Sequence, residues 1–359
     1  SGGQYEPHWS FVPPKRSYVL NDIDQYIGRQ IEAAGTTFSD EAEPEVLARR
    51  VSLVLTGLPP EPEQLQTYLA DKSDSAYEHL IDAILASPRY GEHQARYWLD
   101  AVRYGDTHGL HLDNRRGIYP YRDWVVKSFN DNLPLDDFIR WQLAGDLLPN
   151  PTLEQLTATG FVRMNPTTSE GGAIPAEFQA KNNFDRVETL GTVLLGMSMT
   201  CARCHTHKYD PIPQTEYYQL MAYFNNTSEG AMDGNRYEYG PVVKVPKDQA
   251  GWADWEQFVA NRDQLLKAVT ATCEAPAETL RDLSPDEQLS RLADPEGPFA
   301  RLDYHSEAQR LVKEKDDLTA NFTTSLVARE REKIRPTHVL HRGEYDQPVG
   351  APVEPGVLS

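Results

Sequence analysis

The stretch MSMTCARCHTH, from Met197 to His207, decides how the rest of the chain is interpreted. Cys201 and Cys204 stand three residues apart, and His205 follows the second cysteine directly. C-x-x-C-H is the attachment motif of c-type haem, because two thiols one turn apart add to the two haem vinyl groups while the adjacent imidazole binds the iron. The motif predicts a single covalent haem, with Cys201 and Cys204 as thioether positions and His205 as the proximal metal ligand. The mostly helical pattern of the chain predicts a mainly α, multi-helical domain around it.

Other interpretations of the same residues remain open. Zinc accepts this spacing if His205 or His207 and one distant group complete a tetrahedral site, but the sequence holds no second C-x-x-C and no H-x-x-x-H. A thioredoxin-like redox pair needs a strand and helix around the motif, and the pattern here lacks the strand. The two cysteines also fit a buried pair, as free thiols or as a disulfide.

The composition is typical of a folded protein that does not bind nucleic acid. Its 359 residues allow roughly two domains. The 35 Lys and Arg against 54 Asp and Glu give a net charge of −19, which argues against nucleic acid and anionic lipid as partners. Three cysteines exclude a disulfide framework, and no apolar stretch is long enough to span a membrane.

The N-terminal sequence bears on location. The chain begins Ser-Gly-Gly-Gln, without the basic and apolar regions of a signal peptide, so it is either cytoplasmic or already processed. Covalent attachment of c-type haem takes place outside the bacterial cytoplasm. We therefore expect a periplasmic or secreted protein whose signal peptide has been removed.

Hydrophobic periodicity divides the chain into four parts. Residues 1–20 read as an extended arm, 21–230 as the helical haem domain, 231–334 as a short β segment with a long helical hairpin, and 335–359 as the beginning of a truncated C-terminal domain. The expected helices cover 44–55, 63–70, 75–86, 90–104, 121–129, 135–147, 154–162, 178–200 and 215–224. The hairpin pairs 250–271 with 306–334 across an acidic connection (276–300), and strands are expected within 237–245 and 337–341. The final PVGAPVEPGVLS is expected to end without a closing element, as if the chain continued.

A polar loop, Gly105 to Tyr119, supplies the first group of further candidates. His108 is the preferred distal metal ligand, because the following Gly109 lets the backbone approach a ligand closely. Asp106 is a candidate acid or base, and Arg115 is a candidate for binding haem propionates, as is Arg122 in the next helix. A plain polar loop held by turns and ion pairs explains the same residues equally well.

A second group contains carboxylates and methionines. Glu170 and Glu177 can act as general acid and base beside an open haem pocket, although a loop that caps the next helix is the simpler interpretation. Met197 and Met199 lie too close to the motif to reach the opposite haem face, so they are expected in the core. Two further methionines remain weak axial candidates, Met164 and Met221.

An ordered series of blocks connects these segments to a known family. The blocks are TGLPP (56–60), SPRYGE (87–92), RYWLDAVRYGDTHG (96–109), YRDWV (121–125), QLAGDLLP (142–149), ATGFVR (158–163), EGGAI (170–174), DRVETLGTVLLG (185–196) and CARCHTHKYDPIPQTEYYQL (201–220). They resemble the planctomycete cytochrome-c-like domain, a domain of unknown function (1549), and RPTHVLHRGEYDQP (335–348) resembles the start of its usual C-terminal partner domain.

The resemblance implies an envelope or secreted protein from bacteria whose genomes are rich in polysaccharide-degrading genes. One departure stands at the motif, where the family usually reads C-A-R-C-H-D-H-K and this chain has Thr206 in place of the aspartate. Threonine still forms hydrogen bonds but brings no charge to the proximal ligand.

Three functions follow from these expectations. The preferred one is a haem-dependent redox enzyme that uses peroxide or oxygen, or oxidises a small molecule, with carbohydrate as the substrate suggested by the family's setting. The second is an electron-transfer cytochrome with a redox partner protein. The third is a zinc-stapled module that binds carbohydrate or helps assemble the envelope.

Overall fold

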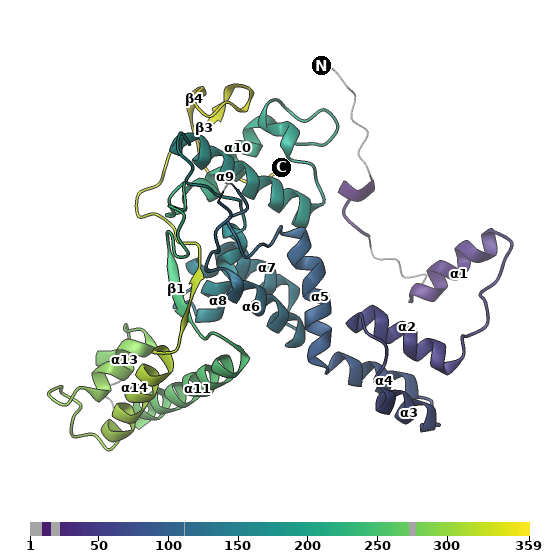
Figure 1. Ribbon diagram of the computed structural model, residues 1–359, viewed down its shortest axis with the longest axis horizontal. Coiled ribbons are helices and arrows are strands. Elements are labelled where there is room, and N and C mark those ends of the chain that lie inside the picture. Colours follow the sequence, from purple (N-terminus) through teal and green to yellow (C-terminus); the bar gives the residue numbers. More distant parts are fainter. Residues whose placement is uncertain (1–8, 16–21, 111, 273–277) are drawn as a thin grey trace. The chain divides into compact units, whose positions relative to one another are not determined.

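The computed structural model describes residues 9–15, 22–110, 112–272 and 278–359 (Figure 1). The chain is mainly helical with minor β structure, which confirms that part of the predicted fold class. It divides into two compact units, one of residues 1–93 with 208–211 and one of 94–207 with 212–359. No helix among the described residues is both long and apolar enough to cross a membrane. The four parts expected from the sequence stay a prediction.

The first unit contains α1 (Ile23–Ala33), α2 (Pro44–Thr56), α3 (Pro62–Ala70) and α4 (Ala76–Leu85). Proline opens α2, and Gly57 ends it in the left-handed conformation at φ 71°, as a C-terminal glycine does. A small core holds the α2 and α4 helices together through Ala48, Leu80 and Ile84. The predicted arm of residues 1–20 lies largely outside the described residues, and Trp9–Phe11 forms an exposed 3₁₀ turn.

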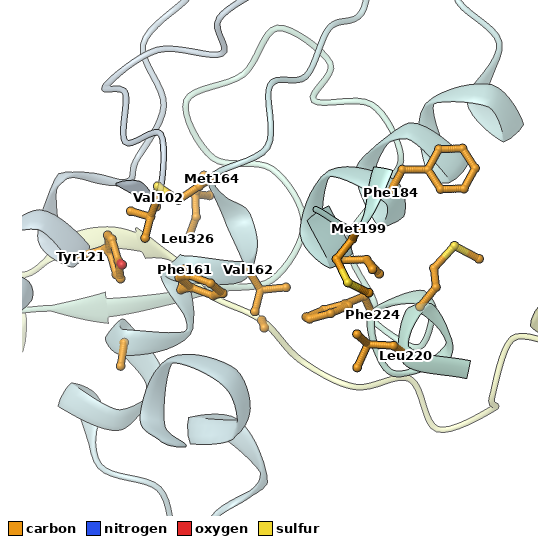
Figure 2. Close-up of a cluster of buried hydrophobic side chains, with 14 of the residues drawn as sticks. Val102, Tyr121, Phe161, Val162, Met164, Phe184, Met199, Leu220, Phe224 and Leu326 are labelled. Carbon is orange, nitrogen blue, oxygen red and sulfur yellow. The ribbon is translucent and has the colours of Figure 1, made fainter. Parts of the chain in front are cut away.

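The second unit contains most of the core. Its helices are α5 (Pro88–Ala101, from residue 94 on), α6 (Tyr119–Asn130), α7 (Leu135–Ala144), α8 (Leu153–Ala158), α9 (Pro175–Leu190) and α10 (Gln214–Asn225). Buried aromatic and aliphatic side chains of these helices and of the turn after α8 form one cluster (Figure 2). Trp124 and Phe138 stack in it with ring centroids 5.3 Å apart. Val102 is buried as expected, whereas Tyr97 and Ala101 are exposed, so the predicted core face of α5 was partly wrong.

The helix expected over 178–200 ends early. α9 stops at Leu190, a π-helical turn follows over Gly191–Leu195, and Gly196 leaves the helix at φ 64°. Met199 then folds back onto Gly191, where an added Cβ would lie 2.0 Å from the Met199 Cγ. The burial of Met199 therefore overrides the helical continuation that the apolar run 193–195 suggested.

A second core belongs to α11 (Gln249–Thr272), α13 (Pro285–Ala293) and α14 (His305–Thr319). α11 packs against both other helices, so the expected two-helix hairpin is a three-helix group. The helix predicted over 306–334 was wrong beyond Thr319. There the β-branched stretch Thr323–Leu326 forms β2, antiparallel to β1 (Val242–Val245).

The C-terminal residues form a hairpin. β3 (Thr337–Leu340) pairs with β4 (Pro348–Val353), and both strands contact α10. The strand predicted at 337–341 is confirmed, and the expectation that the final stretch forms no element was wrong. Its identity as the start of a partner domain stays a prediction. Cys273 and His111 lie outside the described residues.

Candidate functional site

The two motif cysteines lie on a short 3₁₀ turn, Thr200–Arg203, between the end of α9 and the start of α10. The Cys204 N–H donates to the carbonyl of Cys201 at 3.3 Å, which closes the turn. Both thiols are free, and Cys201 is exposed while Cys204 is half-buried. Cys201 and Cys204 therefore do not form a disulfide with each other in this structure. Their spacing on one turn is the spacing that two thioether bonds to haem require.

Helix α10 fixes the backbone of this turn. The carbonyl of Arg203 accepts hydrogen bonds from the Tyr218 hydroxyl at 2.8 Å and from Gln214 Nε2 at 3.1 Å. Ala202, between the cysteines, is fully buried against the core. The turn is thus anchored on its inner side, which leaves the flanking Cys201 side chain toward solvent.

The side chain of Arg203 joins the motif to α9. Its guanidinium lies 5.0 Å from the Phe184 ring and 3.7 Å from the Glu188 carboxylate. Burial raises the pKa of Glu188 above its usual value, although the Arg203 charge opposes the shift. Burial, together with the negative charge of Glu188, also raises the pKa of Tyr217. The motif therefore borders a semi-buried acid whose charge Arg203 partly balances.

His205 has one ring nitrogen committed and one available. Its Nδ1 lies 2.8 Å from the backbone carbonyl of Thr206, so Nδ1 carries the proton that is donated there. In the neutral ring Nε2 then carries no proton, and the side chain is exposed. Metal-bound histidines commonly donate their other N–H to a carbonyl in this way. Because the acceptor is main-chain, this bond does not depend on the Thr206 side chain.

The C-terminal hairpin reaches the motif from another direction. The Cys204 thiol donates to the carbonyl oxygen of Arg342 at 3.1 Å. Arg342 itself lies in the left-handed region at φ 51°. The next residue, Gly343, has φ 75°, and a Cβ there would come within 3.0 Å of the Arg203 side chain. Only glycine suits this close approach.

His108 is deeply buried and hydrogen-bonded at both ring nitrogens. Nε2 lies 3.0 Å from the carbonyl of Arg236, and Nδ1 lies 3.0 Å from the Thr167 hydroxyl and 3.3 Å from Asp233 Oδ2. The side chain is 2% exposed. Among the described residues its polar contacts come from the loops that surround it, and none comes from the C-x-x-C-H turn. A distal role would require Nε2 to give up its carbonyl partner.

Three buried arginines hold these loops together. Arg116 donates to the carbonyls of residues 105, 163, 164 and 165, and Arg163 donates to those of residues 239, 241 and 327. Arg186 donates to the carbonyl of residue 162 and forms an ion pair with buried Glu229. Burial alone would raise the Glu229 pKa, but the charges of Arg186 and Arg163 outweigh it and lower that pKa. The three guanidinium groups bond mostly to main-chain carbonyls, whereas Glu229 Oε2 is buried without a hydrogen-bond partner among the described residues. The arginines therefore serve the fold.

Sequence reasoning missed this network. Arg163 offered the clearest indication, because it stands inside the apolar run GFVRM (160–164), where an unpaired charge would not be tolerated. Its acidic member, Glu229, gave none, since it lies in a polar stretch.

The remaining candidates lie at or near the surface. Asp106 is exposed and accepts a 2.5 Å hydrogen bond from Tyr104. Arg115 is exposed, and Arg122 pairs with Asp123 at 2.8 Å. Glu170 is exposed, and Glu177 pairs with Lys181 at 2.6 Å in the first turn of α9. Their proposed roles with haem stay predictions.

The four methionines named as candidates are buried or partly buried. Met199 is buried as expected, Met197 is partly buried, and Met164 and Met221 belong to the core. Among the described residues, no three His, Cys, Asp or Glu side chains are placed to hold a metal ion together. A zinc site at Cys201 and Cys204 would therefore need another ligand to move toward them.

Comparison with known proteins identifies one family. A family model described as PSCyt2, protein of unknown function (DUF1549), matches residues 22–229. No curated protein and no solved structure matches the chain. The match covers the helices of the first unit, the C-x-x-C-H turn and the loop that carries His108, whereas its partners Asp233 and Arg236 lie beyond the match.

Proposed function

The chain belongs to the PSCyt2 family of unknown function (DUF1549), and from that premise we propose that it is a periplasmic or secreted c-type haem protein that transfers electrons. The observation that carries the proposal is the arrangement of three neighbouring donors. Cys201 and Cys204 present two free thiols on one turn, and His205 keeps Nε2 available while Nδ1 is bonded to a carbonyl. A covalent haem needs these groups in this order.

Each residue of the chain has a defined task in this proposal. The thiols of Cys201 and Cys204 would form the thioether bonds, and His205 Nε2 would bind the iron. Arg203 and α10 hold the turn so that the three groups keep their spacing. Haem, when bound, supplies reversible uptake of one electron and a sixth coordination position.

The exposure of the motif supports electron transfer over catalysis. Cys201 and His205 are both exposed, so a group attached there would present an edge to a redox partner protein. The redox-enzyme alternative, acting on peroxide, oxygen, carbohydrate or another small molecule, needs a protein group on the open side of the iron. His108, the distal candidate, is tied at both nitrogens in a buried loop, so it is not free to serve as that group or as a sixth iron ligand.

The deciding experiment is a pyridine haemochrome spectrum of the chain expressed in a host with cytochrome c maturation machinery. We expect haem that resists acid-acetone extraction, with a thioether-type band, and its loss in the double variant Cys201→Ala, Cys204→Ala. Cys273→Ala is the matched control, because it removes a cysteine outside the motif. A colourless protein with about one zinc per chain would overturn the proposal. Six-coordinate low-spin iron supports electron transfer, whereas five-coordinate high-spin iron would restore the enzyme.

A further inference from the structure

A cavity of about 630 Å³ lies in the second unit, beside the segment that leads into the motif. Its walls come from the end of α7, the π-helical turn, α10 and the C-terminal stretch. Its apolar lining includes Leu147, Val162, Leu190, Leu195, Met197, Leu220 and Phe224. Figure 2 shows Leu220 and Phe224 on the same helix, α10, with Val162 nearby. The volume is that of a site for a small organic molecule, which is typically 300–1,000 Å³.

The hydrocarbon around this cavity is unusually open to solvent. Leu147 is 55% exposed and Leu195 is 48% exposed. Leucine and valine gathered around one hollow form a contiguous apolar surface, unlike isolated exposed side chains. Because contact between this apolar surface and water is unfavourable, the cavity favours an apolar occupant over water.

The ionisable lining residues gather in one place. The Asp146 carboxylate lies close enough to Glu330 and Arg329 to sense both charges. Burial raises the pKa of Asp146, and the Glu330 charge raises it further. The polar end of the cavity thus offers a carboxyl group with a reduced tendency to ionise. A ligand with a fixed charge would meet hydrocarbon on most sides.

We propose that this cavity binds a neutral lipophilic molecule with a hydrocarbon body and one uncharged hydrogen-bonding end, of the long-chain or isoprenoid alcohol class. The body contacts the leucines of α7, the π-helical turn and α10, and the polar end lies at Asp146. Binding at this site does not require haem attachment, so this proposal can be tested independently of the electron-transfer function.

The position of the cavity gives the ligand a defined neighbour. Leu190, Leu195 and Met197 all belong to the segment that ends at Cys201. The Met197 N–H donates to the carbonyl of Gly191 at 2.9 Å across the π-helical turn. π-Helical turns are frequently found at functional sites. An occupant therefore touches the connection between α9 and the motif.

Competition between three ligands with the same chain tests the class of molecule. Nile red is the neutral fluorescent reporter, and the full chain is titrated with 1-dodecanol, dodecanoate and dodecyltrimethylammonium, each below its aggregation limit. We expect dodecanol to displace Nile red at the lowest concentration, since it alone buries no fixed charge. Tighter binding of either ion would overturn the proposed class.

Substitution of the wall tests the location. The double variant Leu147→Gln, Leu195→Gln changes exposed side chains, so folding is expected to persist. We expect a loss of affinity for Nile red and dodecanol of about tenfold. Leu135→Gln is the matched control, because Leu135 is 69% exposed and is not among the lining residues. Equal affinity in the control and the double variant would overturn the site. So would a dimer in the unchanged chain that the double variant converts to a monomer, since the occupant would then be a second copy.

Discussion

The thiol of Cys204 donates a hydrogen bond to the carbonyl oxygen of Arg342, a residue 138 positions later, with the two atoms 3.1 Å apart. This bond connects the motif to the β3–β4 hairpin. A thioether has no S–H to donate, so conversion of Cys204 to a haem linkage removes the bond. Attachment would thus release one contact of the C-terminal hairpin while it adds a covalent group to the turn.

The first prediction concerns the accessibility of Cys204. In the haem-free chain, Gly343→Ala adds a methyl within 3.0 Å of Arg203 at φ 75° and loosens the hairpin from the motif. We expect iodoacetamide to label Cys204 about fivefold faster, corresponding to roughly 1 kcal/mol of local destabilisation, with Cys201 unchanged. Peptide mass spectrometry measures each site.

Gly350→Ala is the control for this prediction. It carries similar backbone strain at φ 71°, but its added methyl meets nothing within 4 Å. Similar labelling rates in the two variants would show that the contact with Arg203 does not protect the thiol.

The second prediction concerns Thr206. Because His205 Nδ1 bonds to the main-chain carbonyl of residue 206, Thr206→Ala is expected to leave the haem spectrum and the midpoint potential of the holoprotein unchanged. The lost hydroxyl accepts only a long hydrogen bond, 3.4 Å from the Gln214 N–H. Thr206→Asp restores the residue usual in the family and is the informative comparison. A spectrum altered by alanine would mean that the hydroxyl acts on the proximal ligand.

The third prediction concerns the buried pair of Glu229 and Arg186. Glu229→Gln leaves the guanidinium without its counter-charge in a closed environment, and we expect a loss of about 3–5 kcal/mol in the free energy of unfolding. Guanidinium chloride denaturation measures it. Glu332→Gln, at an exposed position, should change stability by no more than about 0.5 kcal/mol. Equal effects of the two substitutions would remove the pair from the interactions that stabilise the fold.

The fourth prediction concerns pH and the three-helix group. Asp286 accepts hydrogen bonds from Arg262 at 2.7 Å and Lys315 at 2.6 Å. Burial alone would raise the Asp286 pKa, but these two cations outweigh it and lower the pKa below 3.8. Because the pKa of Asp286 is lower in the folded state than in the unfolded state, its ionised carboxylate stabilises the fold at pH values above the unfolded-state pKa. This stabilisation is lost as the pH falls through the folded-state pKa.

Asp286→Asn is therefore expected to lower the free energy of unfolding by about 1 kcal/mol at pH 7. The loss is modest because solvent screens these partly exposed charges. The difference from the unchanged chain should shrink once pH falls below about 4. Urea denaturation between pH 7 and 3 measures it, with Asp282→Asn, an exposed carboxylate in the same region, as control. A difference that stays constant over this range would assign the effect to packing rather than charge.

Elements with their own end signals could be predicted from the sequence. α2 ended where Gly57 and the following prolines placed the stop, and β3 appeared within its apolar run. α9 was extended too far because the apolar run continued past Leu190, and only the tertiary contact of Met199 with Gly191 ends it. β2 was missed because its partner, β1, lies about 80 residues earlier.

The candidate site divides in the same way. Cys201, Cys204 and His205 are consecutive in the motif, so their proximity could be predicted. The surroundings of His108 come from residues 167, 233 and 236, which no local pattern connects to it. Its burial depends on these contacts distant in the chain, and its role as a distal ligand stays a prediction.

The main-chain targets of Arg116 and Arg163 bear on how this family can diversify. Both side chains form hydrogen bonds to carbonyl oxygens, which every amino acid possesses. Arg163 also contacts one loop side chain, the Tyr239 ring, at 4.7 Å. Natural variants can therefore exchange most loop residues while the path of the backbone persists. Sequence change in the loops is then compatible with a constant backbone. We expect the two arginines to be among the slowest positions to change.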